Sequence, residues 1–416
     1  MRQSLSTTTL EKINYPVLIA QHSALLNEPK WLTDKRQSAW QLYGAELLPD
    51  RVTHLWKYSD PDWFELDGRN ISFEKIKSKL TLSEEAKNKG IILSGLHEAL
   101  LIEKNKKIIE SKLGALTDNY PNKINYLNDA TWSNGLFLYI PRGIKLDEPI
   151  MARTLINQAN KLSALKVLIV LEEEANISFI DGISSNGPED FLTNIVVEIF
   201  LARGSKLNYL NIQTNSKETT QHFFQRALLE DHSELTNLIV ALGGKLTKAD
   251  LGTTLNGTSA GVSTYGIVLG DGVQKFDHHT TIDHKVAHTR SYLNFRVAIK
   301  DKARSAYTGN LKIAHEAVKS EAEQENRNLL LSSDARAESI PELEILTNDV
   351  IKCNHGVTVG QVDKEQIYYL MSRGLTQKDA ERIVIEGFLE PTISRIPLPS
   401  LREEILGKIK SKLENL

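Results

Sequence analysis

The first 120 or so residues have the apolar–polar spacing of α-helices. Between Lys35 and Leu48, apolar side chains recur three and four residues apart, which places them on one helical face. Ser83 is followed by Glu84 and Glu85, the composition of a capped helix start. We therefore predict an N-terminal helical domain over residues 1–125, with loops between the helices.

From about Leu127 the pattern becomes that of short strands. Runs rich in aliphatic and β-branched residues cover 137–140, 166–171, 194–201 and 238–242. Glycine, proline and acidic residues, which favour turns, lie between them. This pattern predicts a mainly β core over residues 126–360.

A weak internal repeat runs through this strand-rich region. Each copy has a polar turn, a small residue and then alternating apolar positions, and the small residues are Ala175, Ser205, Ser233, Ser259, Ala303 and Ala335. The steps between them are 30, 28, 26, 44 and 32 residues. A step near 30 residues predicts a β-solenoid, in which each coil buries its apolar stripe against the next. The long step contains either an unrecognised turn or an insertion, and a β-sandwich with irregular strands is the alternative fold.

Helical spacing returns after residue 360. Asp363 and Thr376 are suited to begin helices, and Gly374 is suited to end the first of them. The apolar positions of the second predicted helix are Ala380, Ile383, Val384, Gly387 and Phe388. Those of the last predicted helix are Leu401, Ile405, Ile409 and Leu413. Residues 361–416 are therefore predicted to form a C-terminal helical domain.

Composition and charge restrict the class of protein. The 416 residues are 41% hydrophobic and 25% charged, which is sufficient for a large core. A formal net charge of −3 argues against nucleic-acid binding, which requires a concentrated basic surface. No apolar run reaches the roughly 18 residues that would span a bilayer, and the start lacks an apolar signal core. We therefore expect a cytoplasmic protein that is not bound to a membrane.

The densest group of possible metal ligands lies between residues 277 and 288. It consists of Asp277, His278, His279, Asp283, His284 and His288. On a strand, His278 and His284 would share one face and would lie roughly 20 Å apart, too far to bind one ion without a bend. A polar rung held by hydrogen bonds, or the lining of a partner surface, is therefore favoured over a metal site.

The only cysteine forms a Cys-X-His pair with a nearby histidine. On a strand, Cys353 and His355 would point the same way, roughly 6.5–7 Å apart along the chain. Thiolate and imidazole both bind iron and zinc, but a closed site commonly has four ligands. From these residues alone, a buried inert cysteine beside a hydrogen-bonded histidine is favoured, and any missing ligands would come from another chain. A single cysteine also excludes an intramolecular disulfide and fits a reducing compartment.

Other catalytic signatures are absent from the sequence. There is no GxxxxGK[ST] phosphate-binding loop, so ATP hydrolysis by that route is not expected. The strand-rich core has no clear pair of carboxylates flanked by exposed aromatic residues, which a polysaccharide-cleaving β-helix would need.

The stretch from residue 326 to residue 374 resembles the SufB/SufD family, the scaffold proteins of the SUF iron–sulfur cluster assembly machinery. The residues that carry the resemblance are Lys352-Cys353-Asn354-His355-Gly356 and Tyr368-Tyr369-Leu370-Met371-Ser372-Arg373-Gly374. The segment Trp56-Lys57-Tyr58-Ser59 is similar to a short motif near the front of these scaffolds, although aromatic packing against the next domain is the favoured interpretation. The single cysteine, and a Cys-X-His pair where SufB chains carry Glu-His, favour the SufD branch.

This resemblance implies a parallel β-helix core and a non-catalytic scaffold role. It implies a heterodimer with SufB, docking of the ATPase SufC, and a transient iron–sulfur cluster in the complex, with no cofactor bound stably by this chain. The resemblance also allows a homodimer of the isolated chain. The expected location is the plastid stroma instead of the cytoplasm if the source is a plant or alga. The alternatives are a β-helix enzyme acting on polysaccharide and a metal-dependent enzyme that uses the 277–288 histidines.

The resemblance also assigns roles to particular residues. From the resemblance, the Cys-X-His pair is expected to be functional instead of inert. His355, and secondarily Cys353, would assist nascent cluster assembly at the SufB interface, with further ligands from SufB. The segment from Thr376 to Pro397 is expected to dock SufC, with Ala380, Ile383, Val384 and Phe388 as the contact residues.

Overall fold

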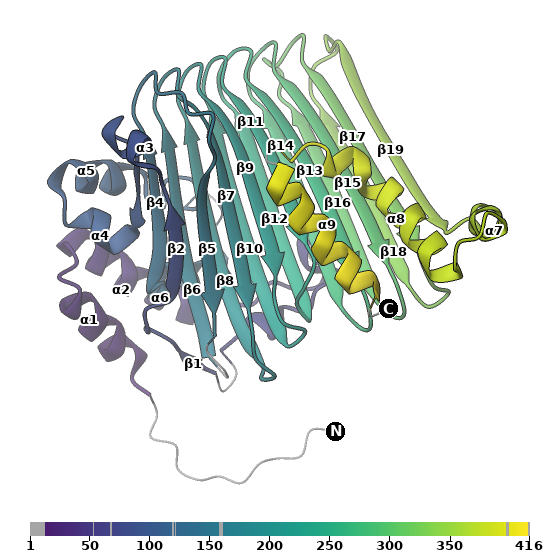
Figure 1. Ribbon diagram of the computed structural model, residues 1–416. Helices are drawn as coiled ribbons and strands as arrows, with labels where there is room; N and C mark the ends of the chain where they lie inside the picture. The colour runs from purple at the N-terminus through teal and green to yellow at the C-terminus, as the bar shows by residue number, and fades with distance from the viewer. Residues whose placement is uncertain are drawn as a thin grey trace, which may run out of the picture.

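The computed structural model describes residues 13–52, 54–66, 69–118, 120, 122–157, 161–396 and 399–414. Two facing sheets take alternate strands of the chain, so that the chain winds as a β-solenoid (Figure 1). One sheet, called sheet A here, contains β4 (Asn134–Ile140), β6 (Lys161–Leu171), β8 (Phe191–Leu201), β10 (Thr219–Leu229), β12 (Leu246–Leu255), β14 (Lys275–His284), β16 (Arg304–Ile313) and β18 (Arg336–Ile345). The other, sheet B, contains β5 (Ile150–Ile156), β7 (Asn176–Ser185), β9 (Lys206–Thr214), β11 (Glu234–Ala241), β13 (Gly261–Gly270), β15 (Arg290–Ile299), β17 (Glu321–Leu330) and β19 (Lys352–Gln361).

Neighbouring strands within each of these two sets are parallel, which confirms the predicted parallel β-helix. From β7 to β19, successive strands of sheet B begin 27 to 31 residues apart. Each coil therefore contributes one strand to each sheet, in agreement with the step near 30 residues. The β-sandwich alternative is excluded.

The long step of 44 residues contains no insertion. Ala175, Ser205 and Ser233 precede strands of sheet B, whereas Ala303 and Ala335 precede strands of sheet A. The step from the fourth site to the fifth therefore crosses one and a half coils. Within this step, two turns were not recognised as copies of the repeat. They end in Gln274 and Thr289, whereas the recognised copies have a small residue at that position.

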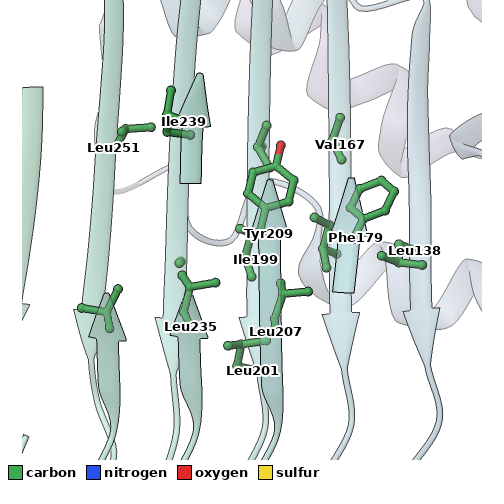
Figure 2. Packing of buried hydrophobic residues seen from close by; sticks show 14 of the residues in the cluster. Leu138, Val167, Phe179, Ile199, Leu201, Leu207, Tyr209, Leu235, Ile239 and Leu251 are labelled. Atoms are coloured by element: carbon green, nitrogen blue, oxygen red, sulfur yellow. The ribbon is translucent and has the colours of Figure 1, made fainter. Parts of the chain in front are cut away.

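Apolar side chains fill the space between the sheets in the first coils. Figure 2 shows Leu138, Val167 and Ile199 of sheet A near Phe179 and Tyr209 of sheet B. Inward-facing aliphatic side chains of this kind each contribute about 1.5–3 kcal/mol when fully buried. Stacking of coils is thus the main source of stability.

The N-terminal part of the chain packs mainly against the outer face of sheet A. Its helices are α1 (Tyr15–Leu25), α2 (Lys30–Ala45), α3 (Glu84–Asn88), α4 (Leu96–Leu100), α5 (Glu103–Lys112) and α6 (Lys123–Thr131), with short 3₁₀ turns η1 (His54–Trp56) and η2 (Pro61–Phe64). Three strands in this region were not predicted, and they are β1 (Asn70–Ile71), β2 (Lys77–Thr81) and β3 (Ile92–Gly95). These strands are too short to show the two-residue alternation of apolar and polar side chains. They form because β6, β5 and β4 have backbone groups that are free to pair with them.

The C-terminal helices are α7 (Lys364–Ser372), α8 (Gln377–Ile393) and α9 (Pro399–Glu414). Asp363 and Thr376 cap the first two helices through their side chains, as predicted. In Figure 1, α8 and α9 lie across the outer face of sheet B instead of covering an end of the solenoid. The predicted stripe of α9, Leu401, Ile405, Ile409 and Leu413, is buried against this face. None of the described helices has the length and apolar character needed to cross a bilayer.

One tight approach between coils requires glycine. A Cβ on Gly257 would overlap backbone atoms of Glu230 and Asp231 in the preceding coil. We expect Gly257→Ala to lower the free energy of unfolding by about 1–3 kcal/mol, because the backbone of the two coils must separate. The urea midpoint measures the loss. Gly261→Ala is the control, since its Cβ would meet nothing closer than 3.9 Å, and equal midpoints for the two variants would contradict the prediction.

Candidate functional site at the open end of the solenoid

The last coil leaves one end of the solenoid open. Among the described strands, β18 and β19 are the final members of their sheets, so each has a neighbour on one side only. Apolar side chains that face inward on these strands, or that lie in the segment between them, are consequently exposed. They are Leu343, Ile345, Leu346, Ile351, Val357 and Val359. This surface could not be predicted from the sequence, because a strand at the end of the stack and a strand within it have the same pattern of apolar and polar residues.

Cys353 and His355 lie together on the inner side of this open end. Cys353 is the register partner of the buried Ala322, and His355 is the partner of the buried Gln324. The expectation that both side chains point the same way is therefore confirmed. Cys353 is half-buried against the core, whereas His355 is exposed.

Burial raises the pKa of the Cys353 thiol. The thiol is therefore a weaker metal ligand in the free chain than an exposed cysteine, because a metal ligand must be the thiolate. Lys352 lies beside it in sequence, but its ammonium pairs with Glu323 at 2.6 Å. No group of three or more histidine, cysteine or acidic side chains in the described part of the chain is arranged to hold a metal ion. Within the described residues, Cys353 and His355 therefore have no third metal-binding side chain arranged with them.

The histidine-rich segment forms β14 and the turn after it. Its side chains alternate as predicted: His278 and His284 face the interior, and Asp277 and His279 face the N-terminal part of the chain. Asp277 accepts hydrogen bonds from Ser59 Oγ at 2.6 Å and from His279 Nε2 at 2.7 Å. It also accepts one from Lys248 Nζ at 3.1 Å. The arrangement around Asp277 is a hydrogen-bonded polar rung, the interpretation favoured from sequence.

The charges in this rung stabilise one another. Burial alone would raise the pKa of Asp277, but the Lys248 ammonium and the hydrogen bonds from His279 and Ser59 outweigh it and hold the pKa well below its ordinary value. Lys248 also lies 4.7 Å from the centre of the Trp56 ring, which stacks on His222. The Trp56–Ser59 segment is thus held to sheet A by aromatic packing, as the favoured interpretation expected.

The interior histidines have different environments. His284 hydrogen-bonds through both ring nitrogens, to Thr289 Oγ1 at 2.7 Å and Ser291 Oγ at 2.8 Å. Burial lowers the pKa of His278 and of His284 to about 4, so both rings are neutral at pH 7. His288 occupies the turn after β14 with φ of +62°. These positions do not converge on a common point.

The proposed docking residues of α8 lie on two sides of the helix. Ala380 is fully buried, while the side chain of Ile383 is 40% exposed. Val384 and Phe388 are partly buried, and the Phe388 carbonyl accepts a hydrogen bond from Arg296 at 2.7 Å. The buried face instead includes Ile385 and Leu389. The side of α8 that contacts sheet B is therefore rotated around the helix axis relative to the apolar stripe predicted from the sequence.

Comparisons with known proteins agree with this architecture. Residues 154–388 match the family model described as "SUF system FeS cluster assembly, SufBD core domain". The iron–sulfur cluster assembly protein SufD of Bacillus subtilis is 29% identical over 379 residues, covering 90% of this chain and 84% of its own length. An iron–sulfur cluster assembly SufBD family protein of Staphylococcus aureus is 26% identical over 417 residues, covering 92% and 89%. The chain belongs to the SufB/SufD family of SUF-system iron–sulfur cluster assembly proteins.

Proposed function

We propose that this chain is a non-catalytic, SufD-type scaffold subunit that pairs with SufB through the open end of its solenoid. The observation that carries the proposal is the position of Cys353 and His355 on that end, in a member of a cluster assembly family. An unpaired strand edge with exposed apolar side chains is a template for another chain. Both β18 and β19 offer such an edge.

The nascent cluster is the cargo of this site, and this chain supplies only part of the ligands. His355 is exposed and can offer a ring nitrogen to iron without rearrangement of the fold. The Cys353 thiol would be deprotonated only when iron or a cation from the partner lies beside it. The remaining ligands would come from SufB, since an iron–sulfur cluster commonly has four.

The C-terminal helices are the proposed docking surface for the ATPase SufC. Exposed apolar and aromatic side chains support this role, because surfaces of this kind commonly bind proteins. They are Tyr368, Tyr369 and Met371 on α7 and Ile383 on α8. Ala380 would act indirectly, since its side chain is fully buried.

Co-purification with SufB and SufC, using wild type and His355→Ala, tests the proposal. We expect the variant to retain both partners but to hold at least about fivefold less iron and sulfide after anaerobic purification, because one ligand of the nascent cluster is lost. His315→Ala is the control, since His315 is an exposed histidine in the turn after β16. Failure of the wild-type chain to retain the partners, or full cluster content in His355→Ala, would overturn the proposal.

A further inference from the structure

The interior of the solenoid changes character along its length. Aliphatic and aromatic side chains predominate in the first coils, where the inward Asp181 is hydrogen-bonded to Tyr209, whereas the inward positions of β17 include Gln324, Asn326 and Asn328. Protein interiors rarely keep polar groups without hydrogen bonds, because each unsatisfied group costs about 1–3 kcal/mol. Unpaired polar atoms near the open end therefore require an explanation.

Gln324 is the clearest case. Its side chain is 3% exposed, and in the described part of the chain neither Oε1 nor Nε2 has a hydrogen-bond partner. The amide reaches across the interior to β16, where it occupies the space that a Cβ on Gly309 would take. Among the residues that the structure describes, the Ser339 hydroxyl on β18 and both ring nitrogens of His278 on β14 also lack partners. Buried polar groups without protein partners are commonly hydrogen-bonded to internal water.

Gln324 and His355 are register partners on adjacent parallel strands. Paired residues of neighbouring strands lie about 4.8 Å apart and point to the same side. Both face the interior of the solenoid, so His355 follows Gln324 in the same inward row, one coil nearer the open end. Among inward residues, Gln324 is thus the polar group paired with the proposed cluster-assembly histidine.

A histidine that binds a metal commonly donates its other ring N–H to a carboxylate or carbonyl oxygen. This hydrogen bond fixes the ring orientation and makes the metal-binding nitrogen more basic. The Oε1 atom of Gln324 is an unused acceptor of that kind. No other acceptor is the register partner of His355 on the inner face, because β19 has a neighbour on one side only.

We propose that Gln324 is a positioning residue for His355, whose ring N–H it accepts, directly or through an internal water, while the other ring nitrogen binds iron of the nascent cluster. This inference rests on the proposed role of His355. It explains why an amide without protein partners is kept where an apolar side chain would cost less. The partner subunit would close the open end and hold the ring over the amide.

Two substitutions at Gln324 distinguish positioning from space filling. Gln324→Met keeps the length of the side chain but removes the acceptor, and we expect about tenfold less iron and sulfide in the purified complex. Gln324→Glu keeps an oxygen acceptor, and we expect at least half of the wild-type content. If Gln324 only filled space, the result would be the opposite, because methionine fits an apolar interior and a buried carboxyl group does not. The urea midpoint of Gln324→Met should equal or exceed that of wild type.

Asn237→Leu provides the matched control. Asn237 is 1% exposed and lies in the same inward row as Gln324, three coils away. Neither of its side-chain polar atoms has a partner among the described residues. We expect wild-type iron and sulfide content for this variant, and an equal loss would overturn the proposal. If His355→Ala loses cluster while Gln324→Met keeps it, the positioning role alone fails. Full cluster content in His355→Ala would instead reject the proposed function itself.

Discussion

Replacement of Asp277 by asparagine is expected to lower the free energy of unfolding by about 3–5 kcal/mol, because it leaves a buried charge without its partner. The carboxylate is 2% exposed and is 3.1 Å from the ammonium of Lys248, which is equally buried. The loss should be measurable as a lower urea midpoint at pH 7. Lys248→Met should recover much of the loss in the double variant, since the uncompensated charge is then removed.

The same strand supplies the control for this prediction. Asp283 also faces outward on β14, but its pair with Lys285, at 2.7 Å, lies near the surface. Asp283→Asn should therefore cost no more than about 1 kcal/mol. Equal losses at the two positions would refute the buried-rung interpretation.

The contribution of Asp277 should be constant over the usual working pH range. Its folded-state pKa is depressed, so its stabilising effect is present above the ordinary aspartate pKa and is lost only as pH falls through the folded value. The difference in unfolding free energy between wild type and Asp277→Asn should therefore not change between pH 8 and pH 5. A difference that disappears within this range would show that Lys248 does not hold the carboxylate in its charged form.

A lysine in place of Val359 is expected to weaken the proposed pairing with SufB by at least about 100-fold, because a partner that covered the open end would bury the new charge without a counter-charge. Val359 faces the inner side of β19 and is 46% exposed in the free chain. The lysine can reach solvent in the unpaired subunit, so the fold should be retained. Titration of a labelled subunit with SufB measures the change in Kd. Any homodimer of the isolated chain should dissociate in parallel.

Thr358→Lys separates the effect of position from that of charge. Thr358 is the next residue on the same strand and is also exposed, but its side chain points to the outer face. A partner strand added to the edge of β19 would leave this side chain in solvent. We expect its Kd to stay within about threefold of wild type. If both lysines weaken pairing equally, the inner side of the open end is not the contact surface.

The alternation of side chains along strands was predictable because it depends only on local geometry. A strand places successive residues on opposite faces wherever it lies. The sequence therefore predicted that Cys353 and His355 share a face and that His278 and His284 lie opposite His279 and Asp283. The coil length and the caps of α7 and α8 were predictable for the same reason, since turns and caps are made by neighbouring residues.

The small residues alone did not predict which of the two sheets each turn of the repeat precedes. Gln274 and Thr289 end turns that are equivalent to those at Ala303 and Ser233, but they differ in chemistry. The side of α8 that packs against sheet B was also not predictable, because several faces of the helix carry apolar side chains. Packing against sheet B selected Ile385 and Leu389, and no local rule distinguishes them from Ile383 and Val384.

The sequence by itself determined the solenoid, the helical regions that flank it, the face shared by Cys353 and His355, and the family. Only the tertiary structure decided which strand edge stays open, which charges face Asp277, and which residue is the register partner of His355. The physical reason is the range of the interactions. Strand alternation, turns and caps are set by residues close in sequence, whereas the partners of β14 and β19 are brought together by coils and segments that are distant in the chain.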